Sequence, residues 1–241
     1  MKYMGSKSRI ARDIVPIIQK HIEKNGGRVY VEPFVGGANI IDKVKCDRKV
    51  GFDINLHLMR LFQHLQGGGA LPEEITREEY TAVRENPTVF HDWYVGCVGF
   101  LSSYNGKYFG GYAGKVHTKA GITRDYYDEA RRNVVAQIEH LRDVEFNCMD
   151  YRKWRSESSF ENCVIYCDPP YATTTKYSGI PAFDHSEFWE IMRNWSERNT
   201  VLISEQTAPA DFECIWMRDV TRTNDNSSRF VTTEKLFRYA G

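Results

Sequence analysis

Asp168-Pro169-Pro170-Tyr171 places a carboxylate and an aromatic ring on either side of two prolines. The apolar run 164–167 directly before it predicts a buried strand, because it is too short for a helix and holds no charge. Each proline fixes φ and lacks a backbone donor, and the residue before a proline is driven to extended geometry. We therefore expect a carboxylate and a ring held rigidly past the carboxyl end of a strand, where open α/β sheets bind ligands. A proline-rich turn that merely closes the strand is the alternative.

Two glycines and an acid downstream of them predict a nucleotide site near the start of the chain. Residues 28–32 form a predicted strand, Gly36-Gly37 a turn that lets a ligand approach the backbone, and 49–53 a second strand. Asp53 ends the second strand at the spacing at which a carboxylate reaches a ribose hydroxyl in doubly wound folds. The full G-x-G-x-x-G pattern is missing, which argues against a dinucleotide and leaves room for another adenosine-containing ligand. For the glycine pair alone, a simple strand-to-helix connection is the alternative.

The long segment 102–121 mixes aromatic and basic side chains with glycines. A loop of this length inside a compact domain is usually functional or disordered, and its aromatics argue against disorder. Rings stack on bases and cations neutralise phosphates, so this composition suits contact with nucleic acid. A solvated loop tied down by its tyrosines is the alternative. The side chains that carry the interpretation are Tyr104, Asn105, Lys107, Tyr108, Phe109, Tyr112, Lys115 and Lys119.

The composition is that of an ordinary globular protein, with 27% charged and 41% hydrophobic residues in a chain of 241. This length favours one domain with an inserted subdomain. Lys plus Arg and Asp plus Glu each number 32, which argues against binding nucleic acid by net charge alone. Residues 1–12 and 97–124 nevertheless hold basic residues and no acid, which leaves two local basic patches.

The six cysteines form no C-x-x-C pair and have no spacing typical of zinc ligands, so we expect buried free thiols and no metal site. No window approaches the length of a membrane span, and the first residues lack the apolar core of a signal peptide. We therefore expect a cytoplasmic protein that makes no membrane contact.

The predicted elements have the order of an α/β protein that is interrupted near its middle. Gly67-Gly68-Gly69 marks a candidate boundary, and the alternation of strands and helices returns only with the strand at 144–148. We expect helices at 6–24, from the glycine turn to about 44, and at 55–66, 76–86, 88–101, 125–141 and 184–198, and strands at 28–32, 49–53, 144–148, 162–167, 200–204, 213–217 and 229–239. The predicted division is one α/β domain from 1–66 and 143–241, with 67–142 as an insert.

Four motifs in this order resemble those of the DNA adenine N6-methyltransferases of the Dam type, the D12 class. Residues 2–7 are similar to the family's opening element, 32–37 to its cofactor loop, 53–55 to its ribose-binding acid and 168–171 to its catalytic motif. Phe183-Asp184-His185 continues the last pattern, and the resemblance covers nearly the whole chain. It implies a Rossmann-like, S-adenosylmethionine-dependent methyltransferase fold with an inserted, mainly helical subdomain that recognises the target.

The resemblance implies a site-specific enzyme that transfers a methyl group from S-adenosylmethionine to N6 of an adenine flipped out of double-stranded DNA. Asp168 and the carbonyl of Pro169 would accept the amino hydrogens, and Tyr171 would stack on the base. The catalytic residues would be Asp168, Pro169, Pro170 and Tyr171, and the cofactor would be bound by Tyr3, Lys7, Pro33, Phe34, Gly36, Asp53, Asp150, Tyr151 and Asp168. DNA would be contacted by Tyr104, Asn105, Lys107, Lys115, Lys119, Arg124, Arg222 and Asn224.

Two departures from the family's pattern bear on the cofactor loop and on the target. Ala38 stands where the family commonly has a third glycine. The recognition loop keeps Tyr104-Asn105 but lacks the family's Asn-Val-Pro-Phe-Gly run. Because few side chains decide which base sequence is bound, this second departure puts a GATC target in doubt.

Other interpretations stay open beside this one. They are methylation of cytosine N4 in DNA, methylation of adenine N6 in RNA, and a DNA-binding homologue without catalysis. Asp168, where a cytosine enzyme would carry Ser, favours adenine within the resemblance, and an intact Tyr171 favours catalysis. The reaction requires neither a metal nor a covalent intermediate, and we expect a monomer without an obligate protein partner. The target sequence, a cognate restriction enzyme and a bacterial or phage origin are left open.

Overall fold

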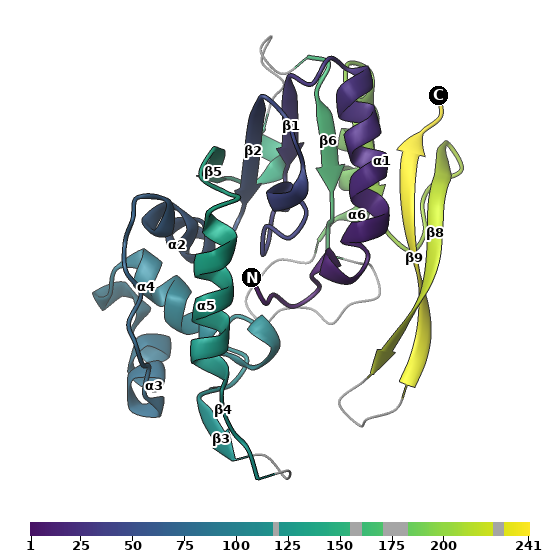
Figure 1. Cartoon of the computed structure of the whole chain (residues 1–241). Helices are drawn as coiled ribbons and strands as arrows, with labels where there is room; N and C mark the ends of the chain where they lie inside the picture. Colours follow the sequence, from purple (N-terminus) through teal and green to yellow (C-terminus); the bar gives the residue numbers. More distant parts are fainter. Residues whose placement is uncertain (118–120, 155–160, 171–182, 224–228) are drawn as a thin grey trace.

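The computed structural model describes residues 1–117, 121–154, 161–170, 183–223 and 229–241. Within these residues a sheet of seven strands forms the centre of the molecule, in the order β5-β2-β1-β6-β7-β9-β8 (Figure 1). Its strands are β1 (Val29–Glu32), β2 (Arg48–Asp53), β5 (Val144–Cys148), β6 (Val164–Cys167), β7 (Thr200–Ser204), β8 (Phe212–Thr223) and β9 (Arg229–Tyr239).

The strand order reverses between β1 and β6, the two neighbours at the middle of the sheet. The chain runs outward from β1 to β2 and β5 on one side, then returns to β6 on the other side of β1 and continues to β7. These five strands are parallel, whereas β9 is antiparallel to β7 and to β8. Residues that follow β1 and β6 therefore meet at a topological switch point, the usual ligand site of such sheets. The predicted α/β, doubly wound fold is confirmed.

Helices cover both faces of the sheet (Figure 1). The core on the α1 side includes Tyr30 and Tyr166, whereas the core on the α6 side includes Val31 and Ile165. Successive strand residues point to opposite faces, which is why sequence neighbours divide between the two cores. The helices are α1 (Ala11–Lys24), α2 (Leu56–Gln66), α3 (Arg77–Glu85), α4 (Asp92–Gly96), α5 (Tyr126–Ile138) and α6 (His185–Ser196). In the described part of the chain no helix has the length and apolar composition to cross a membrane.

The segment between α2 and β5 contributes α3, α4, α5 and a small hairpin of β3 (Lys115–His117) and β4 (Thr123–Asp125). Its apolar side chains do not form a core of their own. Val95, Phe100 and Val134 belong to the same buried cluster as Ile14 and Ile18 of α1. This mainly helical segment is therefore joined to the sheet through a shared core.

Several helices begin where their capping residues predict. Asn55, Asp125 and Asp184 each precede a helix, and each carboxylate or amide oxygen accepts a hydrogen bond from a backbone N–H of the first turn, at 3.0 Å. The first helix is shorter than expected: α1 begins at Ala11, because residues 7–9 form a separate 3-10 turn, η1 (Lys7–Arg9), that Ser6 caps. This turn carries Lys7.

The helix expected between the glycine turn and residue 44 is absent from this described stretch, and that prediction is wrong. The backbone has positive φ at Gly36 and Ala38, and only a short 3-10 turn, η2 (Ile41–Lys43), follows. Gln137 of α5 donates its amide to the carbonyls of Gly37 and Ala38, at 3.2 and 2.9 Å. Gln137 thus donates hydrogen bonds to carbonyls that would otherwise accept backbone N–H groups within a helix.

The stretch expected to be helical over 88–101 is helical except at residues 90 and 91, but it is not one regular α-helix. The chain forms a 3-10 turn at η3 (Pro87–Val89), then α4, then a wider π turn at η4 (Cys97–Leu101). Two glycines allow distant groups to approach this segment closely. A Cβ on Gly96 would lie 2.1 Å from the carbonyl oxygen of His57, and one on Gly99 would lie 2.6 Å from the ring of Tyr108. Packing from outside the segment therefore sets its shape.

The two remaining differences concern stretches that were expected to be loops. Within 102–121 the chain forms the turn η5 (Tyr104–Gly106) and the strand β3, which pairs with β4. Near the C-terminus β8 continues to Thr223, beyond the expected end at 217, because its ladder with β9 extends along the polar residues. Hydrogen bonding between partner strands explains both differences, and single-strand patterns do not contain it.

Candidate active site

Asp168 lies directly after β6, at the switch point, and is paired with a buried lysine. Its Oδ1 atom is 2.7 Å from Nζ of Lys7, and the two side chains are 21% and 6% exposed. Lys7 comes from η1, so the pair joins the start of the chain to the end of β6. Pro169 is buried and Pro170 is exposed, while Tyr171 lies outside the described residues. The sequence predicted Asp168 and Lys7 as site residues but not their contact.

A row of buried polar groups lies on the same face of the sheet as Asp168. The hydroxyl of Tyr30 donates to Oε1 of Glu32 at 2.7 Å, and the hydroxyls of Tyr166 and Ser204 are 2.8 Å apart. Burial raises the pKa of Glu32 well above its ordinary value; the hydrogen bond from Tyr30 opposes this shift, and nearby acids, Asp168 among them, add to it. Sequence reasoning assigned Glu32 no role of its own, although an acid at the end of a buried strand was a signal for one.

Asp53, the predicted ribose-binding acid, lies at the end of β2 and faces the glycine turn. Its Oδ2 accepts a hydrogen bond from the backbone N–H of Gly36 at 3.1 Å, and its Oδ1 accepts one from Asn55 at 3.0 Å. Burial raises the pKa of Asp53, and the N–H groups of Asn55 and Gly36 partly offset that rise. A carboxylate oxygen has capacity for further donors, so ligand hydroxyls can be bound at the same group.

The glycine turn after β1 supports the N-terminal segment. A Cβ on Gly36 would lie 2.8 Å from the ring of Tyr3, and one on Gly37 would lie 2.6 Å from the Cβ of Tyr3. The ring of Tyr3 also stacks on Phe100, with 5.8 Å between centroids. Larger residues at 36 and 37 would therefore displace Tyr3, which the sequence placed in the cofactor site.

Aromatic rings gather beside Asp53. Phe34 contacts Tyr151 at 5.0 Å between ring centroids, and Phe183 lies 5.7 Å from Tyr151. The backbone N–H of Met149 donates to the carbonyl of Asp53 at 3.0 Å, which brings the segment with Asp150 and Tyr151 to the end of β2. Hydrogen bonds from Arg152 lower the pKa of Asp150. The predicted cofactor residues that follow β1, β2 and β5, namely Phe34, Asp53 and Tyr151, are thus close together.

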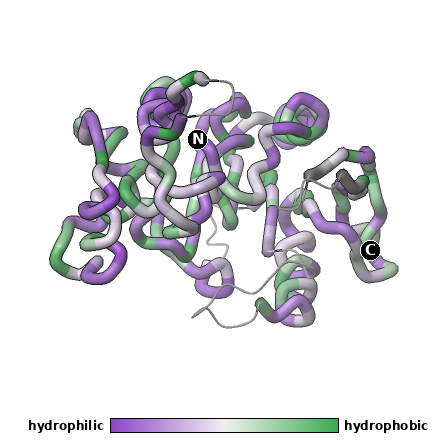
Figure 2. Tube along the Cα trace, turned by 90° about the horizontal axis from the view of Figure 1, so that it is seen from below, coloured by the Kyte–Doolittle hydropathy of each residue, from purple (hydrophilic) through white to green (hydrophobic). Residues whose placement is uncertain are grey.

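The recognition loop meets the N-terminal segment at this edge. Tyr104 is 58% exposed, and Asn105 has a φ of 55°. The turn that holds them is close to the chain start, because a Cβ on Gly106 would lie 2.3 Å from the carbonyl oxygen of Lys2. From below, the N-terminus lies between the insert on the left and the C-terminal strands on the right (Figure 2).

The remaining predicted DNA residues are spread over the insert and the last hairpin. Lys107 is exposed, Lys115 of β3 is 2.9 Å from a carboxylate oxygen of Glu74, and Arg124 of β4 donates two hydrogen bonds to Glu129. Lys119, Asn224 and the side chain of Arg222 lie outside the described residues.

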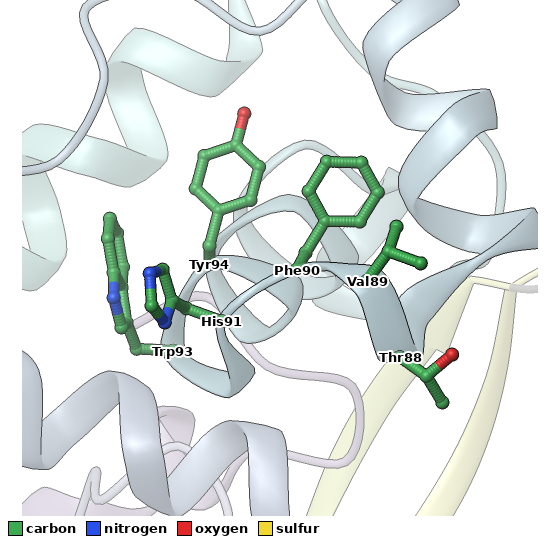
Figure 3. A pocket seen from close by; sticks show the side chains of 6 residues that line it. All are labelled: Thr88, Val89, Phe90, His91, Trp93 and Tyr94. Atoms are coloured by element: carbon green, nitrogen blue, oxygen red, sulfur yellow. The ribbon is translucent and has the colours of Figure 1, made fainter.

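A separate surface hollow of about 480 Å³ lies in the insert (Figure 3). Residues 88–91 with Trp93 and Tyr94 line it, so one short segment supplies all of its walls. It shares no residue with the sheet edge described above. Nor do three or more His, Cys, Asp or Glu side chains gather anywhere in the described ranges as a metal site. The predicted site residues Asp53 and Asp168 lie at the switch point of the sheet, away from this hollow.

The model of one protein family, the D12 class N6 adenine-specific DNA methyltransferases, matches residues 3–228. The chain belongs to this family. The D12 methyltransferase is 28% identical over 203 residues to the DNA adenine methylase of Salmonella typhi, across 78% of this chain and 70% of that protein. It is 27% identical over 203 residues to the DNA adenine methylase of Escherichia coli K12, with the same coverage. It is 24% identical to the type II methyltransferase M.FokI of Planomicrobium okeanokoites, across 73% of this chain and 29% of that protein.

Family membership confirms the predicted reaction class. The D12 methyltransferase acts on N6 of adenine in DNA, and S-adenosylmethionine is the methyl donor of this class. A Rossmann-like methyltransferase fold agrees with the observed sheet.

Proposed function

We propose that the switch point of this D12 methyltransferase is its active site, and that it methylates a single adenine flipped out of double-stranded DNA. The observation that carries the proposal is the position of Asp168 at the end of β6, beside the β1 turn whose Gly36 is hydrogen-bonded to Asp53. Two acids with different surroundings thus lie at one sheet edge. One is paired with a lysine and the other faces backbone N–H groups.

The proposed cofactor roles follow from the chemical groups that these residues present. Asp53 binds the ribose hydroxyls, since a carboxylate accepts from a diol, and Gly36 gives the ligand access to the backbone. Phe34, with Tyr151, supplies rings for the adenine, and Asp150 lies beside them. The other proposed cofactor residues are Tyr3, Lys7, Pro33 and Asp168. When bound, S-adenosylmethionine supplies an electrophilic methyl group on a sulfonium, a cation that aromatic rings stabilise.

The chemical role of Asp168 is to make a poor nucleophile reactive. The lone pair of adenine N6 is delocalised into the ring. Asp168 and the carbonyl of Pro169 accept hydrogen bonds from the two amino hydrogens, which draws N6 toward tetrahedral geometry and frees the lone pair. N6 would then accept the methyl group that bound S-adenosylmethionine supplies as the neutral thioether leaves, and would release one proton to solvent. Proline suits this position because the acceptors must be held in place beforehand.

We assign target recognition to residues 67–142, and the cofactor and the chemistry to 1–66 and 143–241. Tyr104-Asn105 supports this division, because its turn lies against the N-terminal segment that carries Tyr3 and Lys7. Tyr171 would stack on the flipped base, and Pro170 stiffens the segment between that ring and Asp168. Lys107, Lys115, Lys119, Arg124, Arg222 and Asn224 complete the proposed DNA contacts.

Alanine at both Lys115 and Arg124 should weaken binding to unrelated DNA sequences uniformly. Each lost phosphate contact lowers the slope of log affinity against log salt by about one, so the double variant should lose about two. Fluorescence anisotropy over a salt series measures the slope. Arg142→Ala is the matched control, because Arg142 is also exposed and paired, with Glu139, in the turn that follows α5. An unchanged slope in the double variant would contradict the phosphate role.

Gln137→Leu should lower cofactor affinity as well as stability. Its amide holds the carbonyls of Gly37 and Ala38 in the turn that presents Gly36. Unfolding by urea should show a loss of about 1–3 kcal/mol, and calorimetry a weaker cofactor. Gln66→Leu removes a similar pair of bonds, to the carbonyls of Leu141 and Val144 at 2.6 and 2.8 Å, away from the turn. Gln66→Leu, the control, should lower stability and leave cofactor affinity unchanged.

We further propose that the enzyme works in the cytoplasm as a monomer without an obligate protein partner. A single asymmetric base is modified, which requires one active site. Sedimentation of the protein with and without a short duplex measures the stoichiometry, and a two-to-one complex would contradict this proposal.

Transfer of a labelled methyl group tests the function. Duplexes that lack adenine should accept none, and duplexes that lack cytosine should accept it fully. Label on adenine-free DNA would favour cytosine N4, and label on RNA alone would favour an RNA enzyme. No label on mixed genomic DNA, with DNA still bound, would favour a binding protein. Methylation-aware sequencing of DNA from cells that express the protein then identifies the target.

A further inference from the structure

We propose that Lys7 is a positioning residue for methyl transfer, whose buried ammonium keeps the Asp168 carboxylate ionised and correctly aimed. The inference rests on the proposed role of Asp168 and adds to it. A lysine is rarely buried unless it is paired, and Lys7 is 6% exposed with its Nζ 2.7 Å from Oδ1 of Asp168. The ion pair with Asp168 therefore compensates the Lys7 ammonium for its lost hydration.

The turn η1 fixes the position of Lys7. Ser6 caps the turn by accepting the N–H of Ser8 at 3.2 Å, and Ile10 donates its N–H to the carbonyl of Lys7 at 3.0 Å. Ile10 is 3% exposed and anchors the end of the turn in the core. A backbone held at both ends directs the ammonium to one place, so it also restricts the orientation of the carboxylate it contacts.

The groups around Asp168 make such a cation necessary. Three buried weak acids interact electrostatically with Asp168: Glu32 from β1, and Tyr166 and Cys167 from β6. Asp42 and Lys43 of η2 act in turn on Glu32, and Glu234 of β9 acts on Tyr166. Burial and then the charge of Asp168 raise the pKa of Tyr166 well above its ordinary value. In such surroundings a carboxylate without a counter-charge takes up a proton more readily.

Protonation of Asp168 would stop the reaction. The ionised carboxylate only accepts hydrogen bonds, whereas the protonated acid carries an O–H donor in place of one acceptor. Adenine N6 presents two hydrogens and needs acceptors. Removal of the ammonium should therefore raise the pH at which the enzyme gains activity, beyond any general loss of rate.

The rate of a single turnover, measured with saturating cofactor and DNA from about pH 5 to about pH 9, tests the inference. Lys7→Met should move the midpoint of the acid limb upward by about one to two pH units, the size of the effect of an opposite charge at contact distance. Lys7→Arg keeps the charge and should restore the midpoint. Lys7→Gln keeps a polar side chain without charge and should behave as Lys7→Met does, which covers the case that the methionine variant does not fold.

Lys49→Met is the matched control. Lys49 is also 6% exposed and paired, with Nζ 3.1 Å from Asp143, but it lies on β2 away from Asp168. Its acid limb should keep the wild-type midpoint. An active Lys7→Met or Lys7→Gln enzyme with an unmoved acid limb would overturn the inference, and reduced cofactor affinity in calorimetry would then leave Lys7 only its proposed contact with the cofactor. A wild-type enzyme that does not methylate adenine overturns the proposed function itself, so the two failures are distinguishable.

Discussion

Replacing Asp168 with asparagine is expected to slow methyl transfer by about a hundredfold to a thousandfold, with cofactor affinity reduced far less. An amide has one acceptor and one donor where the carboxylate has two acceptors, and it carries no charge, so it is the weaker acceptor for the N6 hydrogen. Loss of one preorganised group of this kind typically costs about a hundredfold to a thousandfold in rate. Single-turnover transfer of a labelled methyl group measures the rate, and calorimetry with S-adenosylmethionine measures the affinity.

A second variant separates the chemical effect from a loss of stability. Asp168→Asn removes the carboxylate that the buried Lys7 contacts, which should cost about 3 kcal/mol of unfolding free energy. The double variant Asp168→Asn with Lys7→Met removes both charges and should recover most of that stability. Its rate should remain as low as that of the single variant. A single-turnover rate within about tenfold of wild type in either variant would show that Asp168 is not the acceptor.

The second large effect is expected from Asp53→Ala, which should weaken binding of S-adenosylmethionine by about a hundredfold. Two hydrogen bonds from ribose hydroxyls to a carboxylate contribute about 1.5 kcal/mol each, and about 3 kcal/mol corresponds to that factor. The rate with saturating cofactor should change little, because Asp53 touches no reacting atom. Asp219→Ala is the control: Asp219 is an exposed acid of β8 that accepts a bond from Thr233. Equal losses of affinity in the two variants would argue against a ribose contact.

Local patterns were enough to predict the strands and most of the capped helices. A short apolar run before Asp168 and a short strand before Asp53 are readable from nearest neighbours, as are the caps at Asn55 and Asp184. The two acids at strand ends could therefore be assigned to one edge of a sheet. These are the features for which the physical cause lies within a few residues of the effect.

Contacts between distant segments account for what the sequence did not predict. Lys7 and Asp168 lie in different segments of the proposed catalytic unit, far apart in the chain, and nothing near either residue indicates that they pair. The turn at Ala38 depends on Gln137, a buried amide on a helix remote in the sequence. The break at Gly96 depends on the carbonyl of His57. Such pairings follow from the packed fold and become visible only there.

The shared core of the insert and α1 has an evolutionary consequence. Val95, Phe100 and Val134 pack in one cluster with Ile14 and Ile18, so residues 67–142 are not an interchangeable cassette. A homologue's segment grafted in their place would carry side chains shaped for another α1, and mismatched cores cost stability. New target specificity in this lineage is therefore expected to arise by point changes at exposed positions such as Tyr104 and Lys115, rather than by exchange of a whole module.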